Sequence, residues 1–193
     1  MSVAHRDVVL DNERGQLYIA MAGTHQIWAY SLERGGKAFA LAGNGAERNL
    51  NGSRLSSVSF AQPSGLSLVE NTLVIADSES SSIRAIDLDQ VCFHTRPLSC
   101  VPTLVGGWVV VKKKKKTAAC MSFLQNKAFG IAGGDPIFAD NLFRFGDHDG
   151  TGSSALLQHP LAALALSSDT ALIADSYNHK IKRVNLKTGL NMY

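Results

Sequence analysis

Three copies of one repeat constrain the fold of this 193-residue chain more than any other feature. The segments YIAMAGTHQIWAYSL (residues 18–32), VIADSESSSIRAIDL (residues 74–88) and LIADSYNHKIKRVNL (residues 172–186) align without gaps. Each contains an apolar stretch, a polar break and a second stretch in which apolar and polar residues alternate. Alternation with a period of two is typical of a β-strand with one buried face. Each copy therefore predicts a β-hairpin.

Short apolar stretches surround each predicted hairpin. A stretch with a polar turn precedes every copy, as DVVLDNERGQL, GLSLVENTL and ALALSSDTAL. A fourth stretch that ends in glycine follows the first two copies, as AFALAG (residues 38–43) and VPTLVGG (residues 101–107). The third copy reaches the last residue, Tyr193, before its fourth stretch. The repeating unit is thus a four-stranded antiparallel meander.

Four-stranded antiparallel units in tandem are typical of β-propeller blades. A β-sandwich would not require near-identical units, and the chain has no sustained 3.6-residue period that would indicate helical repeats. We therefore expect an all-β fold, an incomplete β-propeller with two four-stranded antiparallel blades and most of a third. Closing such an arc would require the remainder of a propeller, because two apolar blade faces stay uncovered.

The third copy, IADSYNHKI (residues 173–181), resembles the NHL repeat, which is named after an Asn-His-Leu signature. Asn178 and His179 match that signature, the second copy keeps Asp77 but carries serines, and the first copy carries His25. The resemblance covers the chain except for about residues 108–133 and implies a propeller of NHL type. In the most similar members a thioredoxin-like domain precedes the propeller. No C-x-x-C-like motif occurs here, so thioredoxin chemistry is not expected.

The signature side chains are expected to shape the hairpin turn and to have no catalytic role. Asp, Ser and Asn at such turns hydrogen-bond the local backbone. A residue that recurs in every repeat belongs more often to the framework than to a single active site. The residues to which we assign this structural role are Asp77, Asp175, Asn178, His179 and His25.

A short acidic motif, DHDGTG (residues 147–152), resembles the start of a calcium-binding loop. The EF-hand pattern requires a bidentate glutamate eleven residues after the first aspartate, and Gln158 stands there instead. We interpret the motif as a glycine-rich link between blades, and we expect no metal and no cofactor.

The spacing of the repeats reveals an additional segment. Ala20 and Ala76 are 56 residues apart, whereas Ala76 and Ala174 are 98 residues apart. A stretch that matches no repeat lies within the longer interval and contains five consecutive lysines, Lys112–Lys116. We predict a blade at residues 1–43, a linker and blade at 44–107, an inserted loop at 108–133, and a linker and truncated blade at 134–193.

Three interpretations of the inserted loop stay open. It is a basic loop for localisation or RNA, a loop without function, or the product of a translated intron or alternative splicing, which the flanking Gly-Gly pairs favour. Without the lysine run, 14 Lys and Arg residues face 16 Asp and Glu residues, so the rest of the chain is near neutral. We therefore do not expect nucleic acid to be a partner of the chain as a whole.

Cysteines and hydropathy restrict the protein class further. Three cysteines without C-x-x-C spacing predict free thiols, and not a disulfide scaffold. The N-terminus has no apolar signal-like region, and no stretch approaches the ~18 apolar residues of a membrane span. These features predict a protein of the cytosol with no membrane partner.

The leading functional hypothesis is a non-catalytic scaffold that binds a protein partner through loops at one rim. One alternative is an enzyme with a metal on the propeller axis, a hydrolase or lyase, which would need carboxylates and histidines from several blades. A second is an RNA-binding NHL propeller with a basic rim. The side chains that would form such a rim are Arg84, Lys180, Lys182 and Arg183.

Overall fold

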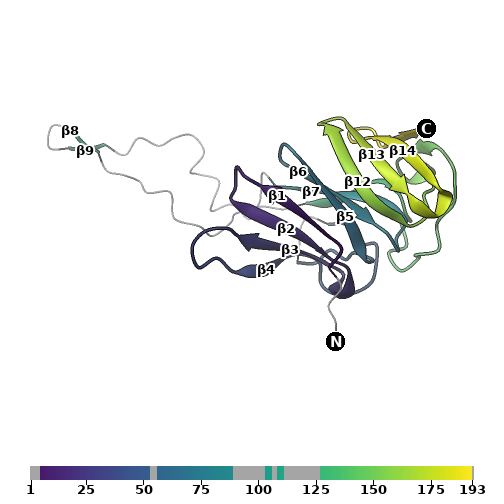
Figure 1. Ribbon diagram of the computed structural model, residues 1–193, viewed down its shortest axis with the longest axis horizontal. Helices are drawn as coiled ribbons and strands as arrows, with labels where there is room; N and C mark the ends of the chain where they lie inside the picture. Colours follow the sequence, from purple (N-terminus) through teal and green to yellow (C-terminus); the bar gives the residue numbers. More distant parts are fainter. Residues whose placement is uncertain (1–4, 53–55, 89–102, 106–107, 111–126, 193) are drawn as a thin grey trace.

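The computed structural model describes residues 5–52, 56–88, 103–105, 108–110 and 127–192. Its described residues form three antiparallel β-sheets that lie side by side in chain order, together with one separate two-stranded hairpin (Figure 1). The expected all-β fold is confirmed: the three sheets are consecutive blades of an incomplete β-propeller. Within these residues no helix is long and apolar enough to cross a membrane.

The first blade is a four-stranded meander whose strands follow one another in chain order. Its strands are β1 (Asp7–Asp11), β2 (Gln16–Met21), β3 (Gln26–Ser31) and β4 (Ala38–Ala42). A single turn of 3-10 helix, η1 (Ala22–Thr24), connects β2 to β3. This is the strand, polar turn and strand that the first repeat copy predicted.

The second blade takes its fourth strand from an unexpected part of the chain. Its strands are β5 (Pro63–Val69), β6 (Thr72–Asp77), β7 (Ser82–Asp87) and β10 (Ala128–Gly133). The sequence placed the fourth strand at residues 101–107, and this is wrong, because β10 pairs with β7. The strand β8 (Thr103–Val105) pairs instead with β9 (Trp108–Val110).

The reason is that AFGIAG in β10 repeats the AFALAG that ends the first blade. Each segment ends in a glycine with positive φ, 105° at Gly43 and 73° at Gly133, a conformation that favours glycine. The inserted loop predicted at 108–133 therefore extended too far, by the six residues of β10. The lysine run Lys112–Lys116 lies outside the described residues.

The third blade contains three long strands and the beginning of a fourth. Its elements are β12 (Pro160–Ser167), β13 (Thr170–Asp175), η3 (Ser176–Asn178), β14 (Lys180–Asn185) and β15 (Leu190–Met192). The sequence predicted that the blade stops before its fourth strand, but β15 already pairs with β14. A short strand of the preceding linker, β11 (Gly150–Thr151), pairs with β15 and is followed by η2 (Gly152–Ser154).

Adjoining blades pack against each other through apolar faces. We name the face toward the following blade the forward face, and the face toward the preceding blade the rear face. The first core contains forward-face residues Tyr18, Ala20, Ile27 and Ala29 of the first blade and rear-face residues Leu66, Leu73, Ile75 and Ile86 of the second. The second core contains forward-face residues Val74, Ala76, Ile83 and Ala85 of the second blade and rear-face residues Ala163, Ala171, Ile173 and Val184 of the third.

The linkers complete both cores. Phe60, from the linker before the second blade, is buried in the first core, and Leu157, from the linker before the third blade, is buried in the second. The first strand of each blade, β1, β5 and β12, lies next to its counterpart in the adjoining blade. The blades therefore converge along their first strands, as in a propeller.

Gly65 permits a close approach between the second and third blades. A Cβ atom at this position would lie 2.6 Å from the Ala162 Cα in β12, a distance at which the backbone must move. Gly52 has ordinary space by comparison, since a Cβ there would be 3.5 Å from the Val58 Cγ1.

We predict that Gly65→Ala lowers the free energy of unfolding by about 1–3 kcal/mol, because the added methyl group overpacks the β5–β12 junction. Urea unfolding followed by circular dichroism measures the change. The matched variant Gly52→Ala should stay within about 0.5 kcal/mol of the unsubstituted chain. Equal stabilities of the two variants would show that the junction is not packed as described.

Candidate functional site

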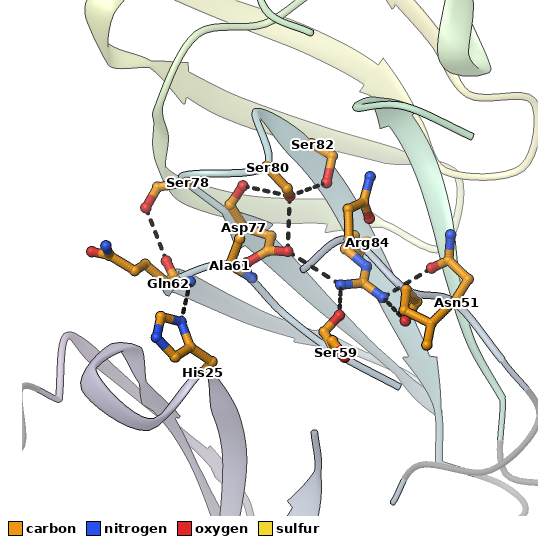
Figure 2. A network of polar contacts seen from close by, with 12 residues as sticks. His25, Asn51, Ser59, Ala61, Gln62, Asp77, Ser78, Ser80, Ser82 and Arg84 are labelled. Carbon is orange, nitrogen blue, oxygen red and sulfur yellow. Dashed lines mark hydrogen bonds and ion pairs between the residues drawn. The ribbon is translucent and has the colours of Figure 1, made fainter. Parts of the chain in front are cut away.

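A buried ion pair occupies the centre of the second blade. The Asp77 Oδ2 at the end of β6 lies 3.2 Å from a guanidinium nitrogen of Arg84 in β7, and both side chains are fully buried (Figure 2). The carboxylate also accepts the Ala61 N–H at 2.8 Å and the Ser80 hydroxyl at 2.8 Å. Three donors thus satisfy a charge that would otherwise be costly to bury.

The guanidinium of Arg84 holds the linker that precedes the blade. It donates to the Leu50 carbonyl at 2.8 Å, to the Asn51 Oδ1 at 3.0 Å and to the Ser59 carbonyl (Figure 2). It also lies over the Phe60 ring, 4.3 Å from its centroid. Asp77 binds the linker at Ala61, and Arg84 binds it at residues 50–51 and at Ser59. The ion pair therefore attaches two separate stretches of the linker to the β6–β7 hairpin.

Burial has opposite effects on the two partners. It raises the pKa of the Asp77 carboxyl, while the neighbouring Arg84 charge and the hydrogen bonds to the carboxylate act against that rise. Burial lowers the pKa of the Arg84 guanidinium, and the Asp77 charge acts against that fall. Each residue therefore needs the other, because removing one partner leaves an uncompensated buried charge.

The third blade contains the same arrangement with a lysine. The Asp175 Oδ1 accepts the Gln158 N–H at 2.7 Å, and its Oδ2 accepts the Asn178 amide at 2.7 Å. The ammonium of Lys182, in the repeat position of Arg84, lies 3.5 Å from the Asp175 Oδ2 and donates to the Leu156 carbonyl at 3.3 Å. Asp175 and Lys182 are both fully buried.

The acidic motif of the linker surrounds this lysine. The Lys182 Nζ lies 3.0 Å from the Asp147 Oδ1 and 3.6 Å from the Asp149 Oδ1, and Lys180 pairs with Asp147 as well. These lysine contacts hold the pKa of Asp147 below its usual value. An ammonium group thus stands where a calcium loop would hold its cation, and the motif serves as a linker. Among the described residues, no three His, Cys, Asp or Glu side chains converge as a metal site requires.

The first blade has lost both charges together. Met21 stands in the repeat position of Asp77, and Trp28 stands in that of Arg84. The Trp28 indole donates to the Gln26 Oε1 at 2.9 Å, which satisfies its only donor within the blade. The aspartate and its cation therefore vary as one unit across the three repeats.

In the first and second blades, the residue that ends the turn between the second and third strands links the blade to its neighbour. His25, Ser81 and His179 occupy one repeat position and share a left-handed conformation, with φ of 54°, 49° and 55°. The His25 Nδ1 accepts the Gln62 N–H of the second blade at 3.3 Å, and the Ser81 Oγ accepts the His159 N–H of the third blade at 3.4 Å. Each donor precedes a proline that begins a first strand.

The structure does not assemble the four basic residues into a rim. Arg84 and Lys182 are buried within the ion pairs, so the prediction that they face a partner is wrong. Lys180 is partly exposed and paired with Asp147, and Arg183 is exposed on the forward face of the third blade. The strand alternation gave no sign that a lysine and an arginine would be fully buried.

Sequence reasoning missed the structural role of Arg84 and Lys182 although a signal for it was present. Arg84 and Lys182 each follow the repeat aspartate by seven residues, and the first copy lacks both members. A basic residue that recurs with an acidic one at fixed spacing indicates a structural pair. The linker atoms that complete each site lack such a signal, since their contribution is mainly backbone carbonyl and N–H groups.

A groove of about 450 Å³ lies where the second and third blades meet, away from the ion pairs. Its residues come from the β5–β6 turn, β10, the β12–β13 turn and the end of β14. The lining residues are Val69, Glu70, Thr72, Phe129, Ile131, Ser168, Leu186 and Lys187. The lining thus combines apolar side chains with polar and charged ones.

Sequence comparison identifies relatives in plants and animals, although no family model matches the chain. The chain is 44% identical over 181 residues to Protein SUPPRESSOR OF QUENCHING 1, chloroplastic, of Arabidopsis thaliana. It is 40% identical over 192 residues to NHL repeat-containing protein 2 of Homo sapiens. The chain is an NHL-repeat propeller segment homologous to these proteins.

This NHL-repeat segment corresponds to only part of each relative. The alignments cover 93% and 91% of the chain but 14% of the plant protein and 22% of the human protein. Among solved structures, an auxiliary nutrient binding protein from Bacteroides ovatus matches with a TM-score of 0.62 over 91% of the chain and 36% of that protein. At 17% identity this likeness concerns the fold alone.

We predict strong coupling between the two members of the buried pair of the second blade. Asp77→Asn and Arg84→Met should each lower the free energy of unfolding by about 3–5 kcal/mol, because each leaves one buried charge unpaired. The double variant should cost clearly less than the sum, with a coupling energy of about 1–3 kcal/mol.

Chemical denaturation of the four proteins measures this cycle. Arg183→Met, which removes an exposed guanidinium from the neighbouring blade, is the control and should change stability by no more than about 0.5 kcal/mol. Additive losses in the double variant would contradict a structural pair.

Proposed function

We propose that this chain is a non-catalytic scaffold that binds a protein partner. The observation that carries the proposal is the use of its buried charges. Asp77, Arg84, Asp175 and Lys182 bind one another and the linkers, and all four are inaccessible to a substrate. The residues best suited to chemistry thus hold the linkers on the blades, and an accessible feature is a groove with a mixed polar and apolar lining.

The groove between the second and third blades is the proposed partner site. Its volume of about 450 Å³ falls in the range of about 300–1,000 Å³ that small ligands and peptide side chains occupy. Val69, Phe129 and Leu186 provide apolar surface, and Glu70 and Lys187 flank it. Since the Lys187 ammonium pairs with Asp169, an extended peptide with one or two apolar side chains suits the groove better than an anion.

An enzyme with a metal on the propeller axis would need metal ligands on the first strands, along which the blades converge. These strands offer few candidate ligands. The acidic residues of β1, β5 and β12 are Asp7 and Asp11, both in β1. The Asp7 carboxylate accepts the N–H groups of Val8 at 2.8 Å and Leu66 at 2.7 Å, and Asp11 pairs with Arg14 at 2.9 Å. Carboxylates engaged in this way are not arranged to bind a common metal.

The RNA-binding alternative depended on the basic rim. Two of the four rim residues are buried, and Lys180 forms an ion pair with Asp147. Of the four, Arg183 is therefore the residue best placed to contact a phosphate. Contact with several phosphates requires several accessible cations, so this arrangement favours a protein partner.

The compartment of the proposed scaffold is open to direct test. The sequence predicts the cytosol, whereas one relative is named a chloroplastic protein. Fractionation of cells that express the natural chain distinguishes the two, and it also decides from which extract a partner should be isolated.

We predict that filling the groove removes partner binding. Ser168→Trp places a large ring at an exposed groove position, and Ser56→Trp makes the same change at an exposed site outside the groove. In affinity capture from extracts with the full chain, partners retained by Ser56→Trp should fall at least about tenfold with Ser168→Trp, since loss of a few contacts costs about 1.4 kcal/mol or more.

Identical captured sets for both variants would contradict binding at the groove. Metal-dependent hydrolysis of an ester or phosphoester that is lost in Asp7→Asn would contradict the non-catalytic part of the proposal.

A further inference from the structure

Two Asn-Gly pairs lie in the linker between the first and second blades, Asn44-Gly45 and Asn51-Gly52. In such a pair the glycine nitrogen can attack the side-chain amide carbon of the asparagine, because glycine has no side chain that would hinder the approach. The new C–N bond closes a succinimide ring, and the amide nitrogen leaves as ammonia with the proton of the attacking nitrogen. Water then opens the ring and leaves either aspartate or isoaspartate.

The carbonyl under attack is polarised at both asparagines, and both residues are exposed. The Asn44 Oδ1 accepts the Ala46 N–H at 2.9 Å and the Ser59 hydroxyl at 2.9 Å. The Asn51 Oδ1 accepts the Arg84 guanidinium at 3.0 Å (Figure 2). Donors of this kind stabilise the negative charge that develops on the oxygen during the attack. Exposure and polarisation therefore do not distinguish the two pairs.

The attacking nitrogen does distinguish them. The Gly52 N–H donates to the Ala128 carbonyl at 3.0 Å, and the Gly52 carbonyl accepts the Ala128 N–H at 2.9 Å, so this glycine is fixed to β10. The Gly45 N–H has no hydrogen-bond partner among the residues that the structure describes. Gly45 also has a φ of 87° and open space around it. The hydrogen bond from the Asn44 side chain to the backbone two residues on is an Asx turn, which folds that side chain back toward the Gly45 peptide group.

We propose that Asn44 is a site of spontaneous deamidation, and that its bridge to β10 protects Asn51-Gly52 from the same reaction. The attack at Asn44 requires no bond of the fold to break, whereas the attack at Asn51 requires the Gly52 N–H to leave the Ala128 carbonyl. An unmade hydrogen bond of this kind has to be overcome before the ring can close.

The product at position 44 affects the junction between the first two blades. The Asn44 N–H donates to the Val58 carbonyl at 2.8 Å, and its side chain holds Ser59, so this residue joins two stretches of the linker. Phe60, which follows directly, is buried in the first core. An isoaspartate adds one methylene group to the backbone, so these bonds cannot all be kept. Deamidation therefore loosens the linker that supports Phe60. This inference does not depend on the groove proposed above.

Peptide mapping of the aged chain tests the proposal. Trypsin cleaves after Lys37, Arg48 and Arg54, so Asn44 and Asn51 fall in separate peptides. During incubation of the folded chain at mildly alkaline pH, Asn44 should convert at least about tenfold faster than Asn51, since one hydrogen bond to the attacking nitrogen corresponds to a factor of this size in rate. In guanidinium chloride the two rates should become similar, because the reacting pair is the same.

Equal rates in the folded chain, or faster conversion at Asn51, would overturn the proposal. A preference for Asn44 that persists in guanidinium chloride would overturn it as well, because the preference would then come from the neighbouring sequence and not from the fold.

Denaturation of the aged chain tests the structural consequence. The isoaspartyl fraction, identified by enzymatic methylation, should unfold at a lower denaturant concentration than the fresh chain. Freshly prepared Asn44→Asp is the matched control, since it has the charge of the product with a normal backbone, and it should unfold like the fresh chain. Aged Asn44→Gln should accumulate no isoaspartate at this position. An unchanged midpoint of the isoaspartyl fraction, or an equal loss in Asn44→Asp, would contradict loosening by the lengthened backbone.

Discussion

The buried pair of Asp77 and Arg84 is the interaction on which the junction between blades depends. A propeller linker must leave the outer edge of one blade, cross the next blade and enter its first strand, and its backbone groups need partners on the way. The carboxylate binds the linker at Ala61, and the guanidinium binds it at Leu50, Asn51 and Ser59. With the linker held, Phe60 fills the core between the first two blades.

The third blade shows that the cation of this buried pair can be replaced. Lys182 replaces the arginine and has fewer donors, and the linker compensates with Asp147 and Asp149 near the ammonium. The first blade dispenses with the charges altogether through Met21 and Trp28. Paired replacement is consistent with the physics of buried ions: an intact pair can be exchanged for apolar residues, but half a pair is costly.

Much of the fold followed from local patterns. Two-residue alternation, polar breaks and the repeat itself predicted the hairpins, the meander and the propeller class, all of which are confirmed. The fourth strand of the second blade was misplaced because VPTLVGG and AFGIAG both resemble a glycine-ended strand, and pairing alone distinguishes them. The candidate sites were less accessible to prediction. The sequence analysis identified the signature aspartates as structural residues. It placed their partners, Arg84 and Lys182, on an exposed rim, whereas the structure buries both.

The sequence by itself determined the repeat, the strands and the family resemblance, because these depend on neighbours along the chain. Only the tertiary structure decided the environment of Arg84 and Lys182. Alternation places both on the rear face of a hairpin, yet their burial depends on linker residues that lie 25 or more residues earlier in the chain. The groove likewise exists only once whole blades are packed together, since it is assembled from strands that are remote in sequence.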